Sequence, residues 1–208
     1  MAARPVTVVK LGGSYAQAAD LKPWLAAIGT CAGHVVLVPG GGPFADAVRD
    51  AQGKIGFDDR TAHHMALLAM DQYGCALASL AKNLTRAVST AAIREALDRG
   101  KIPIWAPTEM VLAAGDIPAS WDVTSDSLAA WLAAKLGAAS LLLVKRSRPA
   151  GPCVRASDLV TQGTIDAKFP EFLRASGAAA AIAGPANHAA VAAAIRSGTL
   201  CGTLIDPH

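Results

Sequence analysis

Residues 7–14 read Thr-Val-Val-Lys-Leu-Gly-Gly-Ser, and this stretch decides the fold class. Its β-branched, apolar start predicts a strand that is buried on both faces. Gly12 and Gly13 follow the strand and allow backbone N–H groups to turn toward an anion, while Lys10 adds a full positive charge nearby. With Ser14, these residues form a candidate polyphosphate site, although an ordinary strand-to-helix turn has the same pattern. The motif is neither a Walker loop nor a GxGxxG turn.

A second glycine-rich stretch, Val-Pro-Gly-Gly-Gly-Pro at residues 38–43, repeats the arrangement of a buried strand followed by a turn. Consecutive glycines are entropically costly unless the backbone must approach something closely, and Pro43 suits the first turn of a helix. Because the carboxyl ends of parallel strands can face one crevice, one loop could hold a phosphate donor and the other its acceptor. Gly40, Gly41 and Gly42 are therefore candidate acceptor residues, and a plain tight turn is the alternative.

The rest of the chain alternates short apolar runs with longer alanine-rich segments. This alternation predicts an α/β fold, in which a mostly parallel sheet carries helices on both faces. The predicted strands are 7–11, 34–38, 102–105, 140–144, 179–183 and 203–205. The predicted helices are 21–29, 43–52, 59–80, 90–98, 127–136, 169–175 and 187–196, with Thr90 as one N-cap and Ser125 or Asp126 as another.

Two further positions could carry chemistry. Asp126 begins a predicted helix, where it fits either an N-cap or a carboxylate that orients lysine ammonium groups. Lys145 directly follows the apolar run 141–144, where a lysine is often only the first solvated residue. Beside Lys10 it would add a second charge for an oxygen-rich transition state. Phosphoryl transfer depends mainly on such positioning and charge neutralisation.

Composition excludes several classes of protein. A net charge of +3, spread along the chain, does not predict a nucleic-acid partner. The apolar stretch 177–195 is interrupted by Gly, Pro, Asn and His, so no membrane span is expected, and the N-terminus lacks the pattern of a signal peptide. The four cysteines are far apart, which predicts buried, reduced thiols in a cytoplasmic protein rather than a metal site. They are Cys31, Cys75, Cys153 and Cys201.

In this order, the motifs resemble those of the amino acid kinase superfamily. The resemblance covers KLGGS, GGGPFAD, SDSLAAWLAAKLGA, the lysine after LLLV and the closing GTLI. It implies a three-layer αβα sandwich in a single domain over 1–208, with an acceptor-binding lobe at about 1–120 and a nucleotide-binding lobe at about 121–208. It also implies ATP with Mg²⁺ as the donor, no metal held by the protein itself, and a homo-oligomer.

The same resemblance implies a role for each candidate residue. Lys10 and Lys145 would contact the transferring phosphoryl group, and Asp126 would hold them in place. ATP phosphates would bind at Gly12, Gly13, Ser14 and Lys145. The acceptor would bind at Gly40, Gly41, Gly42, Asp46 and Ser125.

Departures from the family pattern narrow the acceptor. Residues 145–149 replace a TDVDGVY-like loop, and Asp46 stands where isopentenyl phosphate kinases have a histidine, which argues against an isoprenoid. Segments 62–66, 69–74 and 121–131 are most similar to kinases that convert [5-(aminomethyl)furan-3-yl]methyl phosphate to its diphosphate in methanofuran-type cofactor synthesis. The acceptor ammonium would then meet Asp46, Asp122 or Asp126, and Trp121 could stack on the furan ring.

Other interpretations stay open at this point. A kinase of a small carboxylate or carbamate, or a binder of nucleotide or another oxyanion without catalysis, has the same motifs. His63 and His64 lie about 100° apart on a helix, so at most one is expected to face the site. Lys168 fits either a surface residue or a nucleotide contact. Trp24 and Trp131 are expected in the core.

Overall fold

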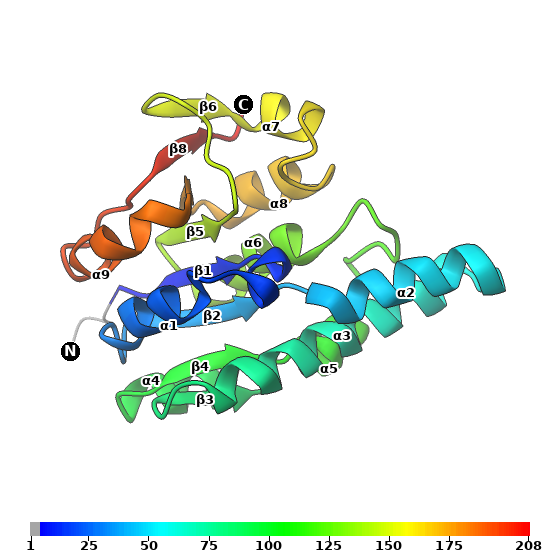
Figure 1. Cartoon of the computed structure of the whole chain (residues 1–208), viewed down its shortest axis with the longest axis horizontal. Helices are drawn as coiled ribbons and strands as arrows, with labels where there is room; N and C mark the ends of the chain where they lie inside the picture. The colour runs from blue at the N-terminus through cyan, green and yellow to red at the C-terminus, as the bar shows by residue number, and fades with distance from the viewer. Residues whose placement is uncertain (1–4) are drawn as a thin grey trace.

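The computed structural model describes residues 5–208, and Figure 1 shows a central sheet with helices packed around it. The sheet has the strand order β3-β4-β2-β1-β5-β7-β8-β6. Strands β7 and β8 run antiparallel, and the other pairings in the described part of the chain are parallel. The predicted mostly parallel sheet is confirmed. The strands are β1 (Thr7–Leu11), β2 (Val35–Pro39), β3 (Leu84–Ala87), β4 (Ile102–Trp105), β5 (Ser140–Val144), β6 (Cys153–Arg155), β7 (Ala179–Ala183) and β8 (Thr203–Asp206).

The six predicted strands are all present, each within one residue of its predicted bounds. β1 lies at the centre, where Lys10 pairs in register with Val38 of β2 and Leu143 of β5. This register brings the ends of three strands to one edge of the sheet. The sequence did not predict β3 and β6, which are short edge strands with partly exposed residues rather than buried apolar runs.

Helices cover both faces of the sheet, which confirms the three-layer sandwich. One core cluster contains residues of α4, α6 and α8, and the other contains residues of α1 and α9. α3 contributes to both clusters. The helices are α1 (Leu21–Gly29), α2 (Gly42–Ile55), α3 (Asp59–Ser79), α4 (Thr90–Asp98), α5 (Thr108–Leu112), α6 (Ser125–Leu136), α7 (Ala156–Thr161), α8 (Phe169–Ser176) and α9 (His188–Arg196), with 3₁₀ helices η1 (Gly13–Gln17) and η2 (Pro185–Asn187).

Two predicted N-caps are wrong. Ser89, not Thr90, occupies the N-cap of α4 and accepts a hydrogen bond from the backbone N–H of Ala92. α6 begins two residues earlier than predicted, so Ser125 and Asp126 lie inside its first turn and Thr124 holds the N-cap position. Asp126 is therefore free of a capping role, and its side chain is available for another purpose.

The cysteine prediction holds only in part. All four thiols are free; Cys31 is buried, Cys201 is half-buried, and Cys75 and Cys153 are exposed. Trp24 and Trp131 are buried in the core as predicted. Within residues 5–208, no helix combines the length and apolar character needed to cross a membrane.

Candidate active site

The two glycine turns contact each other directly at the carboxyl edge of the sheet. Gly40 donates its backbone N–H to the carbonyl of Leu11 at 2.9 Å. A Cβ atom on Gly13 would lie 2.3 Å from the backbone nitrogen of Gly42, and one on Gly40 would lie 2.4 Å from the nitrogen of Gly13. These distances are far below any normal contact, so the glycines are required by close backbone approach. The result is a cradle lined by main chain, which suits phosphate oxygens.

Lys10, Asp126 and Lys145 meet in one cluster. The ammonium group of Lys10 lies 2.9 Å from Oδ1 of Asp126, and that of Lys145 lies 2.6 Å from Oδ2. Lys10 and Asp126 are buried, with 4% and 3% of their surface exposed, and the Lys145 side chain is 16% exposed. One carboxylate thus holds two ammonium groups, each by its own oxygen, beside the glycine turns.

Burial and mutual attraction shift the ionisation of this cluster in opposite ways. Burial lowers the pKa of Lys10 to about 8, against the attraction of Asp126, and the positive charge of Lys145 adds to the lowering. For Asp126, burial alone would raise the pKa, but Lys10 and Lys145 together lower it to about 2. At pH 7 the carboxylate is ionised and Lys10 is mostly protonated, so the cluster carries excess positive charge.

A cavity of about 280 Å³ opens beside the cluster. Of the predicted site residues, its lining includes Gly13, Ser14, Gly41, Gly42, Asp46 and Ser125. Lys10, Gly12, Gly40, Asp126 and Lys145 are not part of the lining. The predicted acceptor residues therefore lie mostly on the cavity wall.

The far wall of the cavity comes from α2, α3 and the segment before α6. The guanidinium of Arg49 lies 4.3 Å from the ring centre of Trp121 and 3.5 Å from a carboxylate oxygen of Asp46. Trp121 donates its Nε1–H to Oε1 of Gln52 at 2.7 Å, and Gln52 donates to Oδ1 of Asp59 at 2.8 Å. This chain of contacts joins the segment before α6 to the two helices of the wall.

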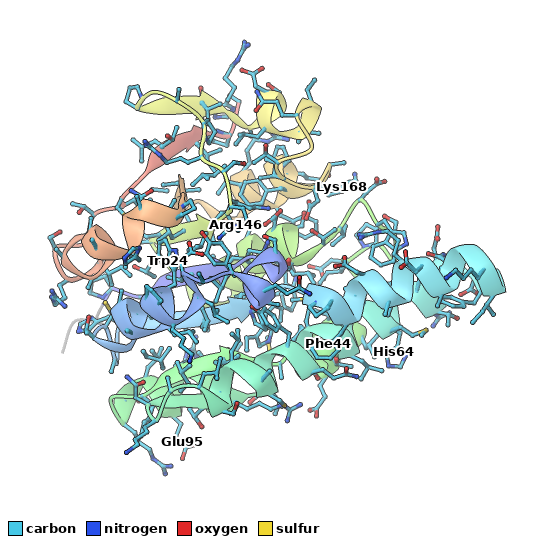
Figure 2. The ribbon with its side chains drawn as sticks, in the orientation of Figure 1. Trp24, Phe44, His64, Glu95, Arg146 and Lys168 are labelled. Atoms are coloured by element: carbon cyan, nitrogen blue, oxygen red, sulfur yellow. The ribbon has the colours of Figure 1, made fainter. Side chains whose placement is uncertain are left out.

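His63 also lines the cavity, whereas His64 is exposed on the outside of α3, as Figure 2 shows. Of the two histidines, His63 alone lines the cavity, which agrees with the expectation that at most one faces the site. Burial, followed by the proximity of His64, lowers the pKa of His63 below its usual value. His63 is therefore neutral near pH 7 and presents a ring rather than a charge.

Two other candidates lie away from the cavity. Lys168 pairs with Glu171 at 3.0 Å on the surface and has a side chain that is 43% exposed (Figure 2). Asp122 is exposed and does not line the cavity. Asp126 already holds two ammonium groups. Three carboxylates were candidates for binding the acceptor ammonium, and of these Asp46 lines the cavity.

Two sets of long-range contacts involve Lys145 and the residues around Asp126, and neither was predicted from the sequence. The Tyr15 hydroxyl donates to the backbone carbonyl of Lys145 at 2.9 Å. Asp166 accepts hydrogen bonds from the N–H groups and hydroxyls of both Thr124 and Ser127. These partners are 39 to 130 residues apart in the chain, so no local spacing could have linked them.

Comparison with known proteins gives a consistent result. The model of the amino acid kinase family matches residues 5–147. The chain is 27% identical over 181 residues to the [5-(aminomethyl)furan-3-yl]methyl phosphate kinase of Methanocaldococcus jannaschii, covering 80% of this chain and 82% of the relative.

Solved structures show the same fold. Uridylate kinase from Archaeoglobus fulgidus superposes with a TM-score of 0.71 at 18% identity, covering 97% of this chain and 100% of that one. UMP kinase from Bacillus anthracis gives 0.69 at 19% identity, with 98% and 97% covered. Aspartate kinase from Synechocystis gives 0.64 at 13% identity, over 86% of this chain and 38% of that one.

Proposed function

The chain belongs to the amino acid kinase family, and from this premise we propose that it transfers the γ-phosphoryl group of ATP to a small phosphomonoester. Membership makes it an ATP-dependent small-molecule kinase. The observation that supports the proposal most is the single buried carboxylate of Asp126, which holds the ammonium groups of Lys10 and Lys145 beside two touching glycine turns.

The residues present fit ATP. The first turn, Gly12 to Ser14, would hold donor phosphates through the backbone N–H groups of Gly13 and Ser14, while the N–H of Gly12 donates to the carbonyl of Val144. ATP would bring Mg²⁺, which neutralises phosphate oxygens when bound. In the described part of the chain, no group of three or more His, Cys, Asp or Glu side chains could hold a metal.

Catalysis in this proposal is positioning and charge neutralisation. Lys10 and Lys145 would face the oxygens of the migrating phosphoryl group from two sides. Asp126 keeps them 2.9 and 2.6 Å from its own oxygens, so they are oriented before substrate binds. A phosphomonoester acceptor supplies its own nucleophilic oxygen and is ionised near pH 7. No general base is needed, and the described cluster offers a carboxylate whose pKa of about 2 makes it a poor one.

The cavity wall supports an acceptor that carries a cation and a flat ring. Asp46, which also pairs with Arg49, and Asp59 line the cavity with carboxylates, and Trp121 and His63 line it with aromatic rings. [5-(Aminomethyl)furan-3-yl]methyl phosphate has both features together with the phosphate. The Methanocaldococcus jannaschii relative is named for this substrate, so we propose it as the acceptor here, in methanofuran-type cofactor synthesis.

An acceptor panel tests the proposal. The purified protein is incubated with ATP and Mg²⁺ and one of four acceptors: the furan phosphate, its analogue without the aminomethyl group, UMP, or acetylglutamate. We expect the diphosphate of the aminomethyl compound as the fastest-formed product. Acyl phosphate from acetylglutamate, with no product from the phosphomonoesters, would instead identify a carboxylate kinase. Nucleotide binding without turnover on any acceptor would identify a binding protein.

Three further expectations belong to the same proposal. The chain acts as a homo-oligomer in the cytoplasm, and the lobes at about 1–120 and 121–208 hold acceptor and nucleotide respectively. Light scattering of the purified protein measures the mass in solution, and a monomer would contradict the first of these. Thr124 and Ser125, at the start of the 121–208 lobe, also line the cavity. We therefore expect the acceptor to make a few contacts with this lobe as well.

A further inference from the structure

We propose that Asp166 is a positioning residue for phosphoryl transfer, which holds the first turn of α6 so that Asp126 presents both of its oxygens to the two lysines. The proposal rests on the kinase function above and adds a residue for which no role has been assigned. Asp166 comes from the segment between α7 and α8, far from the glycine turns in the sequence.

The contacts of Asp166 flank the catalytic carboxylate on both sides. Oδ2 accepts the N–H of Thr124 at 2.9 Å, the hydroxyl of Thr124 at 2.7 Å and the N–H of Ser127 at 3.0 Å. Oδ1 accepts the hydroxyl of Ser127. Thr124 is two residues before Asp126 and Ser127 is one residue after it. One carboxylate therefore fixes the backbone at both ends of the short segment that carries Asp126.

The helix itself provides no substitute for these contacts. Thr124 occupies the N-cap but makes no side-chain capping hydrogen bond, and the N–H of Ser127, in the first turn of α6, donates to Asp166 instead. Capping from a separate segment differs from the local caps of α3 and α4, where Asp58 and Ser89 accept the N–H group three residues ahead. Through Thr124 and Ser127, the orientation of Asp126 is therefore tied to the segment between α7 and α8.

The charge of Asp166 also reaches the cluster. Three charges act on Lys10. Asp126 favours its protonated form, Lys145 opposes it, and Asp166 favours it again. Asp166 would thus act in two ways, by holding α6 and by helping to keep Lys10 charged. A purely structural cap would act only in the first way.

The experiment compares Asp166→Asn with Ser127→Ala and with Ser89→Ala, an N-cap variant on α4, which does not line the cavity. The kcat for the best acceptor is measured beside the pKa of Lys10 in the substrate-free protein. The pKa comes from the ¹³Cε shift of labelled lysine, assigned with Lys10→Arg. This second readout needs no substrate, so it remains informative if the proposed acceptor proves wrong.

We expect Asp166→Asn to lower kcat by about tenfold to a hundredfold, the loss typical of misplacing a catalytic group by about 1 Å. It should also lower the pKa of Lys10. Ser127→Ala should lower kcat less and leave that pKa unchanged, because the charge of Asp166 remains. Ser89→Ala should change neither. A Lys10 pKa in Asp166→Asn equal to that of the unmodified protein, or an unchanged kcat, would overturn the proposal. If Asp166→Asn does not fold, Ser127→Ala decides: full kcat in that variant also overturns it.

Discussion

Replacing Gly13 by alanine tests whether the touching glycine turns are needed for turnover. The new Cβ would lie 2.3 Å from the nitrogen and 2.6 Å from the Cα of Gly42, and contacts become ordinary only from 3.4 Å. The difference, 3.4 minus 2.3, means that the turns must separate by about 1 Å. Both opposing atoms are backbone, so no side chain can rotate away. The backbone of Gly13 has no positive φ, so the effect of alanine there is steric rather than conformational.

Two measurements follow from that displacement. Moving the N–H groups that we propose to bind phosphate by about 1 Å should lower kcat/KM for ATP by about a hundredfold. Overpacking should lower the free energy of unfolding by about 1–3 kcal/mol. The assays are coupled ADP release and urea unfolding.

Gly53→Ala is the matched control. Gly53 lies in α2 with nothing within 4 Å of a Cβ, so alanine should raise stability by about 0.5–1 kcal/mol and leave kcat/KM unchanged. A Gly13→Ala enzyme with normal kcat/KM and normal stability would refute the claim that the two turns form one rigid cradle.

Three other predictions follow from the site. Lys10 has a pKa of about 8 and, in the proposed role, must be protonated to neutralise phosphate, so kcat/KM should fall as pH rises through 8. A flat profile to pH 9.5 would contradict the proposed contact between Lys10 and the phosphoryl group. Asp126→Ala leaves the buried Lys10 and the partly buried Lys145 without their shared partner, so stability should fall by about 3–5 kcal/mol in urea unfolding. Asp126→Asn should lose activity with a smaller loss of stability. Trp121→Phe keeps an aromatic ring but loses the hydrogen bond to Gln52, so the KM for acceptor should rise severalfold while the KM for ATP stays unchanged. Equal effects on both KM values would show that Trp121 does not contact the acceptor.

The sequence predicted the parts of the site that lie directly after buried strands. Lys10 lies near the end of an apolar run that predicts a central strand, and the glycine turns and Lys145 follow such runs. Parallel pairing then brings the ends of these strands to one edge of the sheet. Asp126 was harder to interpret, because an acidic residue at a helix start has an ordinary capping role. The structure removes that role by starting α6 at Ser125.

What sequence reasoning missed depends on contacts between distant segments. Asp166 and Tyr15 act through hydrogen bonds to residues 39 or more positions away, and no periodicity encodes such a partner. The edge strands β3 and β6 were not predicted because they lack the buried pattern that identifies central strands. The far wall of the cavity depends on how α2 and α3 pack, and this too is a tertiary property.

The contact between Gly13, Gly40 and Gly42 has a consequence for how such an enzyme could acquire a new acceptor. Since the turns proposed for the donor and the acceptor share one backbone interface, neither can be reshaped without disturbing its neighbour. Selectivity must then be altered at a distance from the reacting atoms, on the helices that bear Arg49 and His63. An engineer who varies only that outer region would keep the phosphate chemistry intact while redirecting it to another small molecule.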